Sequence, residues 1–212
     1  MKGIRFEGLH TYNDFGLILG KKTMGSPAVK KYHLDIPGAD GVLDMTEFHG
    51  EPTYENVKHK FEFSIAAPHS EFPSHFSKVK NALHGRKGRI ILDDDPSFFY
   101  LGRADVSDFT DEKGIGHIVI EFDCEPYKYK LQQTIVTATI SESETVVLTN
   151  SRKRAVPEIT TTAAMTIAFG DGIWTTSAGT YTIPELELVE GDNLVTVTGT
   201  GEITFAWVEG SL

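Results

Sequence analysis

The 212-residue sequence lacks the features that disulfides, cysteine-rich metal sites and membrane insertion require. It contains one cysteine, Cys124, and therefore can form neither an internal disulfide nor a cysteine-rich zinc site. No apolar run approaches the roughly 20 residues of a membrane span. The first residues, "MKGIRFEGLHTYNDFG", have no signal-peptide core. We therefore expect a chain that is made and folded in a cytoplasm and does not enter a membrane.

Positive charge is also scarce. The chain has 20 Lys and Arg against 30 Asp and Glu, which gives a net charge of -10. Non-specific binding to nucleic acid or to anionic lipid needs a basic surface, so this balance argues against both. Apolar residues make up 40% and charged residues 24%, as in ordinary globular proteins. The length allows one large or two small domains.

The composition changes along the chain. Residues 1–130 hold all eight histidines and 17 of the 20 basic residues, whereas residues 131–212 have three basic residues against ten acidic ones. The change falls just after "FDCEPYKYKLQQ", and we place a domain boundary near residues 129–134. The predicted domains are 1–133 and 134–212. The basic run "SRKRAVP" of the second domain is predicted to be a solvated loop or strand edge.

The second domain is rich in threonine and valine at alternate positions, which is typical of half-buried strands. Turn residues recur at "GDG" (170–172), "SAGT" (177–180), "EGDN" (190–193) and "GTGE" (199–202). This spacing predicts five to eight short strands in an antiparallel sandwich. Trp174 and Trp207 could form a platform for sugar rings, although a Trp on a strand is more often a core residue.

The first domain is predicted to be mainly β with one helix. "HKFEFSIAA" alternates apolar and polar residues as a half-buried strand does. Phe72, Phe76, Val79 and Leu83 follow at spacings of four, three and four, which places them on one face of a helix. Pro73 suits the first turn of this helix and Gly85 suits its C-terminus. Three further strands are predicted in "RIILDDD", "FFYLGRADVSDF" and "GHIVIEFDCEPYKY".

Three consecutive aspartates, Asp93, Asp94 and Asp95, separate two of these strands. They could be a metal or acid–base site, or the turn of a hairpin. Adjacent residues of a strand point to opposite faces, so three in a row cannot all bind one ion in regular backbone. Asp and Pro are also favoured in turns. We interpret "DDDPS" as a solvent-facing, five-residue hairpin connection.

Other polar groups lack a chemical partner in the sequence. His33, Asp35 and Asp40 lie in "HLDIPGADG", which has no phosphate-loop context and is interpreted as a turn between strands. "HTYND", from His10 to Asp14, could supply a general base, but no nucleophile motif accompanies it. Cys124 is interpreted as a strand residue.

Several segments, taken in order, resemble one family. They are "FEGLHTYNDFGLIL", "DIPGADGVLDMTE", the Tyr54–Asn56 element before "KFEFSI", "FSKVKNALHGR", "IILDDDPSFFYLGR" and "IEFDCEPYKY". Together they are similar to the distal tail proteins (Dit family) of siphophages and prophages, over roughly residues 1–130. The ending "GEITFAWVEGSL" is similar to the last strand of that family's second domain.

The resemblance implies a structural protein rather than an enzyme. It implies a β-sandwich-like or barrel-like first domain that forms a homo-hexameric ring, and a galectin-like β-sandwich outside the ring. The ring would join the major tail tube protein to the tail-associated baseplate or fibre protein at the distal tip of the virion tail, with a channel for DNA. It would be assembled in the host cytoplasm. No catalytic, cofactor-binding or metal-binding residues, no cofactor and no specific nucleic-acid or membrane partner are implied.

Two other classes of function stay open. One is a carbohydrate-binding adhesion module in the second domain, with Trp174, Trp207 or Tyr181 as the platform. The other is a glycoside hydrolase using acids such as Asp93 to Asp95. That class needs two carboxylates about 5–10 Å apart across a cleft, which consecutive turn residues do not supply.

Overall fold

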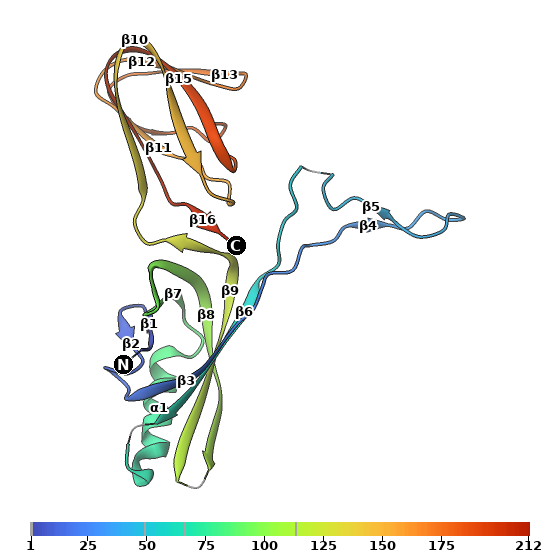
Figure 1. The fold of residues 1–212 in the computed structure, drawn as a ribbon, viewed down its shortest axis with the longest axis vertical. Coiled ribbons are helices and arrows are strands. Elements are labelled where there is room, and N and C mark those ends of the chain that lie inside the picture. The colour runs from blue at the N-terminus through green and yellow to red at the C-terminus, as the bar shows by residue number, and fades with distance from the viewer. Residues whose placement is uncertain (1, 49, 66, 113) are drawn as a thin grey trace. The chain divides into compact units, whose positions relative to one another are not determined.

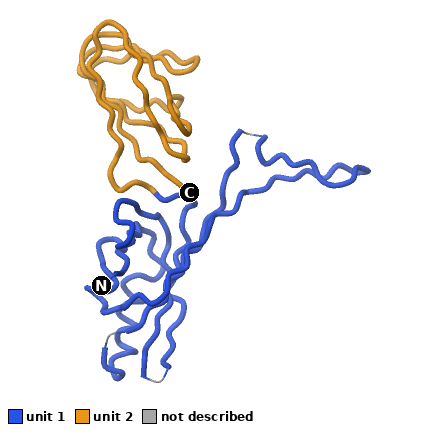
Figure 2. Tube along the Cα trace, in the orientation of Figure 1, with its two compact units in different colours: residues 1–128, 212 blue, residues 129–211 orange. Residues whose placement is uncertain are grey.

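The computed structural model describes residues 2–48, 50–65, 67–112 and 114–212. The chain divides into two compact units, residues 1–128 with residue 212 (unit 1) and residues 129–211 (unit 2), coloured separately in Figure 2. The division precedes the predicted boundary at 133/134 by a few residues. Strand β9 (Ile115–Lys130) spans this division, so regular strand structure continues across it. The change in composition comes only after the end of β9. The separate roles assigned to the two domains stay predictions.

Unit 1 is built on one sheet with the strand order β2-β1-β7-β8-β9-β6-β3 (Figure 1). The strands predicted in this part of the chain are confirmed as β6 to β9. A separate two-stranded ribbon, β4 and β5, lies outside this sheet. The strands of unit 1 besides β9 are β1 (Ile4–Phe6), β2 (Leu9–His10), β3 (Leu17–Met24), β4 (His33–Leu34), β5 (Leu43–Asp44), β6 (Val57–Ile65), β7 (Lys87–Leu92) and β8 (Asp95–Glu112).

The predicted helix is α1 (Phe72–Leu83), preceded by a 3-10 turn, η1 (His69–Glu71). Phe72, Val79 and Leu83 are buried against the sheet, as their spacing predicted. Phe76 is only half-buried and stacks on Phe109 of β8, with ring centroids 5.2 Å apart. The helix therefore covers the apolar face that the alternating residues of β6 and β9 present.

Truncation of the helix face is expected to destabilise unit 1. Leu83 is 1% exposed, so Leu83→Ala should lower the free energy of unfolding by about 2–5 kcal/mol. Ile115→Ala is the matched control, because Ile115 is 52% exposed and its truncation should cost less than about 0.5 kcal/mol. Urea unfolding curves of both variants measure the difference. Equal midpoints for Leu83→Ala and the parent would show that α1 does not pack as described.

Unit 2 is an antiparallel β-sandwich, as predicted, but two of its strands are long. β10 and β15 pair along 17 residues each. The predicted turn "GTGE" lies inside β15 and is wrong. Gly199 and Gly201 there have positive φ values, and Gly199 lies opposite Glu142, which also has a positive φ, so this long hairpin can bend without a loop. The strands of unit 2 are β10 (Thr134–Asn150), β11 (Glu158–Thr161), β12 (Met165–Phe169), β13 (Gly172–Thr176), β14 (Gly179–Thr182), β15 (Gly191–Trp207) and β16 (Gly210–Ser211).

Because the β10–β15 hairpin bends, different parts of β15 belong to the two layers of the sandwich. β11 pairs with residues 203–206 of β15, while β12 pairs with residues 196–199. The apolar side chains between the layers form a second core, separate from that of unit 1. The predicted loop "SRKRAVP" is confirmed, and it is held by ion pairs from Arg152 to Glu190 and from Arg154 to Glu187. None of the described helices is long and apolar enough to cross a membrane.

Candidate functional site: an arm and two polar clusters

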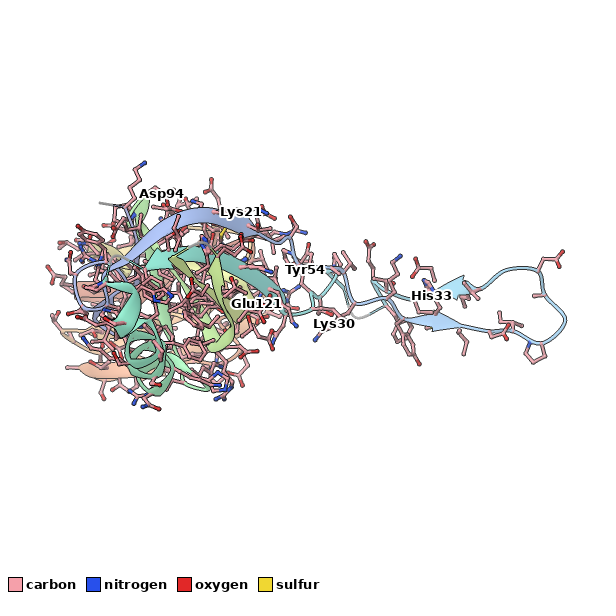
Figure 3. The ribbon with its side chains drawn as sticks, turned by 90° about the horizontal axis from the view of Figure 1, so that it is seen from below. Lys21, Lys30, His33, Tyr54, Asp94 and Glu121 are labelled. Atoms are coloured by element: carbon pink, nitrogen blue, oxygen red, sulfur yellow. The ribbon has the colours of Figure 1, made fainter. Side chains whose placement is uncertain are left out.

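The most unusual feature of unit 1 is a long ribbon between β3 and β6, which we call the arm (residues 25–56). It is held by the β4–β5 pair and by backbone hydrogen bonds such as Lys30 N–H to Thr53 O, 2.8 Å. The predicted turn "PGADG" is confirmed as its tip, between β4 and β5. Figure 3 shows His33 of the arm well away from the sheet of unit 1. The sequence predicted the turn but not the arm that carries it.

The arm concentrates exposed apolar side chains. Among the described residues of unit 1, all the exposed large apolar side chains except Ile115 and Leu212 lie in it: Val29, Tyr32, Leu34, Ile36, Val42, Leu43 and Phe48. A two-stranded ribbon alone is only marginally stable in water. Contiguous exposed apolar surface is typical of a protein–protein contact. The arm thus has the composition of a segment that packs on another protein surface.

The aspartate turn is shorter and less exposed than predicted. Only Asp93 and Asp94 form the turn, and Asp95 already pairs with Leu92 as the first residue of β8. Pro96 is accommodated because the register between β7 and β8 shifts here, and Pro is tolerated at strand starts and bulges. The prediction of a five-residue, solvent-facing connection is therefore wrong in its length, and it is wrong about the exposure of Asp93, which is half-buried.

Each aspartate has a different partner. Asp94 pairs with Lys22 at 2.6 Å and Asp95 with Lys128 at 3.0 Å. Asp93 accepts hydrogen bonds from the Gly3 N–H, 2.8 Å, and from His10 Nε2, 2.9 Å. The three carboxylates are thus spread over three separate contacts and do not converge on one point.

His10 is a structural residue in this arrangement, not a free base. Its Nδ1 accepts the backbone N–H groups of Tyr12 and Asn13, both at 3.1 Å, which leaves the ring proton on Nε2, where it is donated to Asp93. Asp14 accepts the His10 N–H at 2.6 Å. "HTYND" therefore folds into a self-bonded loop that Asp93 ties to the β7–β8 turn.

Loss of the Asp93 charge is expected to loosen the N-terminal segment. Burial alone would raise the pKa of Asp93, but the hydrogen bonds from His10 and Gly3 outweigh it and lower the pKa. A lowered folded-state pKa adds stability above the unfolded value of about 3.9 that is lost as the pH falls through the folded value. Asp93→Asn should lower the free energy of unfolding at pH 7 by about 1–2 kcal/mol.

The control for this substitution is Asp94→Asn, because Asp94 forms a more exposed ion pair that contributes little. Chemical unfolding at pH 7 and at pH 3 checks the result. The difference in free energy of unfolding between the parent and Asp93→Asn should be smaller at pH 3 than at pH 7. A difference that is the same at both pH values, or absent at both, would contradict the role of Asp93.

Cys124 lies on β9, as predicted, and is fully buried. Burial raises the pKa of its thiol to about 12, so the thiolate needed for nucleophilic chemistry is scarce at neutral pH. His33 of the arm lies 3.9 Å from Asp44, while Asp35 and Asp40 are exposed in the tip. Within the described ranges, no group of three or more His, Cys, Asp or Glu residues is placed to hold a metal ion.

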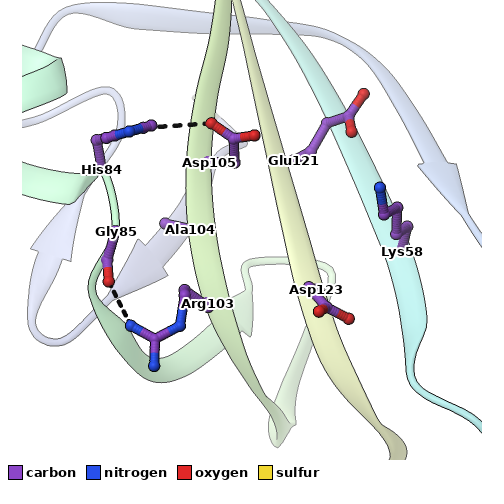
Figure 4. Close-up of a pocket in the computed structure, with 8 residues that line it drawn as sticks. All are labelled: Lys58, His84, Gly85, Arg103, Ala104, Asp105, Glu121 and Asp123. Atoms are coloured by element: carbon purple, nitrogen blue, oxygen red, sulfur yellow. Dashed lines mark hydrogen bonds and ion pairs between the residues drawn. The ribbon is translucent and has the colours of Figure 1, made fainter.

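A polar pocket of about 380 Å³ opens on the sheet of unit 1 (Figure 4). His84 Nδ1 lies 3.2 Å from Asp105, and Arg103 donates to the Gly85 carbonyl at 2.5 Å. Glu121 pairs with Lys60 of β6 at 3.7 Å. Mixed charges that pair across neighbouring strands are typical of a solvated sheet surface. The residues that line the pocket are Lys58, His84, Gly85, Arg103, Ala104, Asp105, Glu121 and Asp123.

The tryptophans of unit 2 do not form a common platform. Trp207 is 2% exposed, and its Nε1–H donates to Asn150 Oδ1 at 3.1 Å, so it is a core residue. Trp174 is half-buried and packs against the same core. Tyr181 is half-buried and its hydroxyl contacts Ser177 at 2.7 Å. Burial of Trp207 removes it from the sugar-binding hypothesis.

Unit 1 thus combines a β-sheet with the helix α1 and a long arm, and unit 2 is an antiparallel sandwich. In a comparison with solved structures, one chain with a similar fold is the Dit (gp 19.1) protein of phage SPP1, described as a paradigm of the hub adsorption apparatus in phages that infect Gram-positive hosts. The TM-score is 0.74 at 14% identity, and 100% of each chain is covered. The resemblance to the distal tail proteins is thereby confirmed in the fold.

A second solved structure, a cupin-2 domain protein of Shewanella frigidimarina, covers 40% of this chain and 71% of its own. Its identity is 17% and its TM-score 0.22, which is too low to bear on the fold. No family model matches the sequence, and no curated protein matches it.

Proposed function

We propose that this protein is a structural component of a phage tail, which assembles as a hexameric ring between the tail tube and the baseplate or fibre protein. The observation that carries the proposal is the full-length fold match to the SPP1 hub protein. In this proposal unit 1 forms the ring and unit 2 lies outside it. The protein acts at the distal tip of the virion tail, and it has no catalytic role.

The arm supports assembly from identical chains. A cyclic ring needs two different complementary patches on each subunit. The arm supplies one patch, because it extends away from the sheet of unit 1 and its apolar side chains are exposed. Interfaces that last in a virion are expected to be large, on the order of 2,000 Å² or more. A ribbon that lies along a neighbouring subunit adds such area at little cost in chain length.

Charge supports the channel of the ring. The net charge of -10 gives the chain no general affinity for phosphate backbones. A channel through which DNA must pass benefits from this property, because a basic lining would retain the DNA.

Electron microscopy of the purified full-length protein tests the proposal. We expect particles with six-fold symmetry and a central opening, formed alone or on addition of the major tail tube protein of the same phage. Salt at 0.5 M should leave the particles intact, because burial of apolar surface is not screened as ion pairs are. Particles without six-fold symmetry under both conditions would contradict the proposal.

A further inference from the structure

The root of the arm rests on a buried histidine. Gly25 is the first residue after β3, where the chain leaves the sheet. A side chain at Gly25 would meet the Lys58 carbonyl at 2.6 Å and Val57 Cγ2 at 2.8 Å, so the arm root lies directly against β6. The Gly25 N–H donates to Nδ1 of His59 on β6 at 3.3 Å.

His59 is only 3% exposed, and one of its nitrogens has no hydrogen bond. Because Nδ1 accepts from Gly25, the ring proton is on Nε2, which is buried without a partner among the described residues. The ring meets Tyr100 of β8 edge-on, with centroids 4.7 Å apart. Its register partners are Met24 on β3 and Phe122 on β9. The surroundings of the ring are therefore mostly apolar.

We propose that His59 is an acid-sensitive anchor, which holds the root of the arm on β6 while the imidazole is neutral and releases it when the imidazole is protonated. Protonation places a hydrogen on Nδ1, where it opposes the Gly25 N–H. The same step creates a charge on a side chain that is only 3% exposed. When the arm root is released from β6, the hydrogen bond between Gly25 and His59 breaks and the imidazole ring becomes exposed.

The neighbouring titratable groups do not neutralise this charge. Tyr100 keeps its proton, because burial first, and then Asp95, Cys124 and Asp94, raise its pKa. Burial likewise raises the pKa of Cys124. Asp94 and Asp95 are engaged by Lys22 and Lys128. On β6 itself, the residues on either side of His59 are Lys58 and Lys60, neither of which is an acid.

The direction of the effect follows from linkage. Burial lowers the pKa of His59 and outweighs a backbone hydrogen bond with Lys58 that raises it, whereas the released ring has the ordinary value of about 6.5. The open arm root therefore binds more protons, and the anchor weakens as the pH falls below about 6.5.

Hydrogen exchange of the Gly25 amide in the full-length protein tests the anchor. Between pH 7.5 and pH 5.0, protection corrected for the intrinsic exchange rate should fall, by up to about thirtyfold for a released ring with a pKa of about 6.5. His59→Asn places a non-titrating oxygen near the position of Nδ1, so its protection should not change with pH. His33→Asn, at an exposed histidine of the arm, is the matched control and should behave as the parent does. Constant protection in the parent, or an equal loss in His59→Asn, would overturn the proposal.

A second measurement needs no substitution and so does not depend on the folding of a variant. In an NMR titration, the His59 ring should titrate below the ordinary histidine value of about 6.5, and the Gly25 amide shift should follow the His59 curve. If the His59 ring titrates at or above that ordinary value, the anchor is refuted. Neither experiment depends on assembly of the protein into a hexamer, so a negative result here leaves the proposed function unaffected.

Discussion

Replacing Leu34 and Leu43 together by serine should abolish or strongly weaken ring assembly while each subunit stays folded. These residues pair across the arm, and they are 45% and 48% exposed in the single chain. Burial of a leucine side chain contributes about 1.5–3 kcal/mol, so loss of two at an interface should raise the dissociation constant at least about 100-fold. Sedimentation velocity over a concentration series measures the shift.

Ile173→Ser is the matched control for the arm variant. Ile173 is also an exposed apolar side chain, 72% exposed, but it lies on β13 of unit 2. Its replacement should leave assembly unchanged, since the proposal places unit 2 outside the ring. Equal weakening by Ile173→Ser, or no weakening by the arm variant, would remove the arm from the assembly surface.

Truncation of Trp207 should have the largest effect on the stability of unit 2. Trp207→Ala empties a core position and leaves the buried Asn150 oxygen without its donor, so we expect a loss of about 3–5 kcal/mol. Asn150 also donates to the Lys153 and Leu188 carbonyls, which ties the loop after β10 to this core. Trp207→Phe keeps an aromatic ring and removes only the N–H, and it should cost less. Thermal unfolding separates the two variants, and equal melting temperatures for Trp207→Ala and the parent would contradict this role.

The same pair of tryptophans addresses the carbohydrate-binding alternative. Trp174 is half-buried and so can be replaced with less damage. We predict that unit 2 has no millimolar or tighter glycan affinity. A glycan array positive for the folded parent and negative for folded Trp174→Ala would overturn this prediction.

Periodicity predicted the elements that are governed by local rules. The helix at Phe72–Leu83 and the strands β6 to β9 follow from apolar spacing, because each buries one face against the same core. The prediction failed where one residue type has two uses. Glycines at 199 and 201 indicated a turn, but in the structure they let β15 bend. Pro96 indicated a loop, but it lies in a strand next to a register shift.

The candidate site was harder to predict than the fold. No local pattern distinguishes the arm from an ordinary pair of strands, since its leucines and tyrosine are exposed in the single chain although they are apolar. The roles of Asp93 and His10 depend on contacts between residues far apart in sequence. His59 gave no signal in the sequence, because only the three-dimensional structure shows that its ring is buried beside Gly25.

The mass of the full-length protein in solution tests the central proposal most directly. Static light scattering over a concentration series at moderate salt, with and without the major tail tube protein, reports how many copies associate. We expect a mass that converges on six chains, and the same limit for a 1–133 truncation that folds. A protein that stays monomeric at every concentration with its tail partner present, or residues 134–212 that oligomerise alone while 1–133 do not, would contradict it.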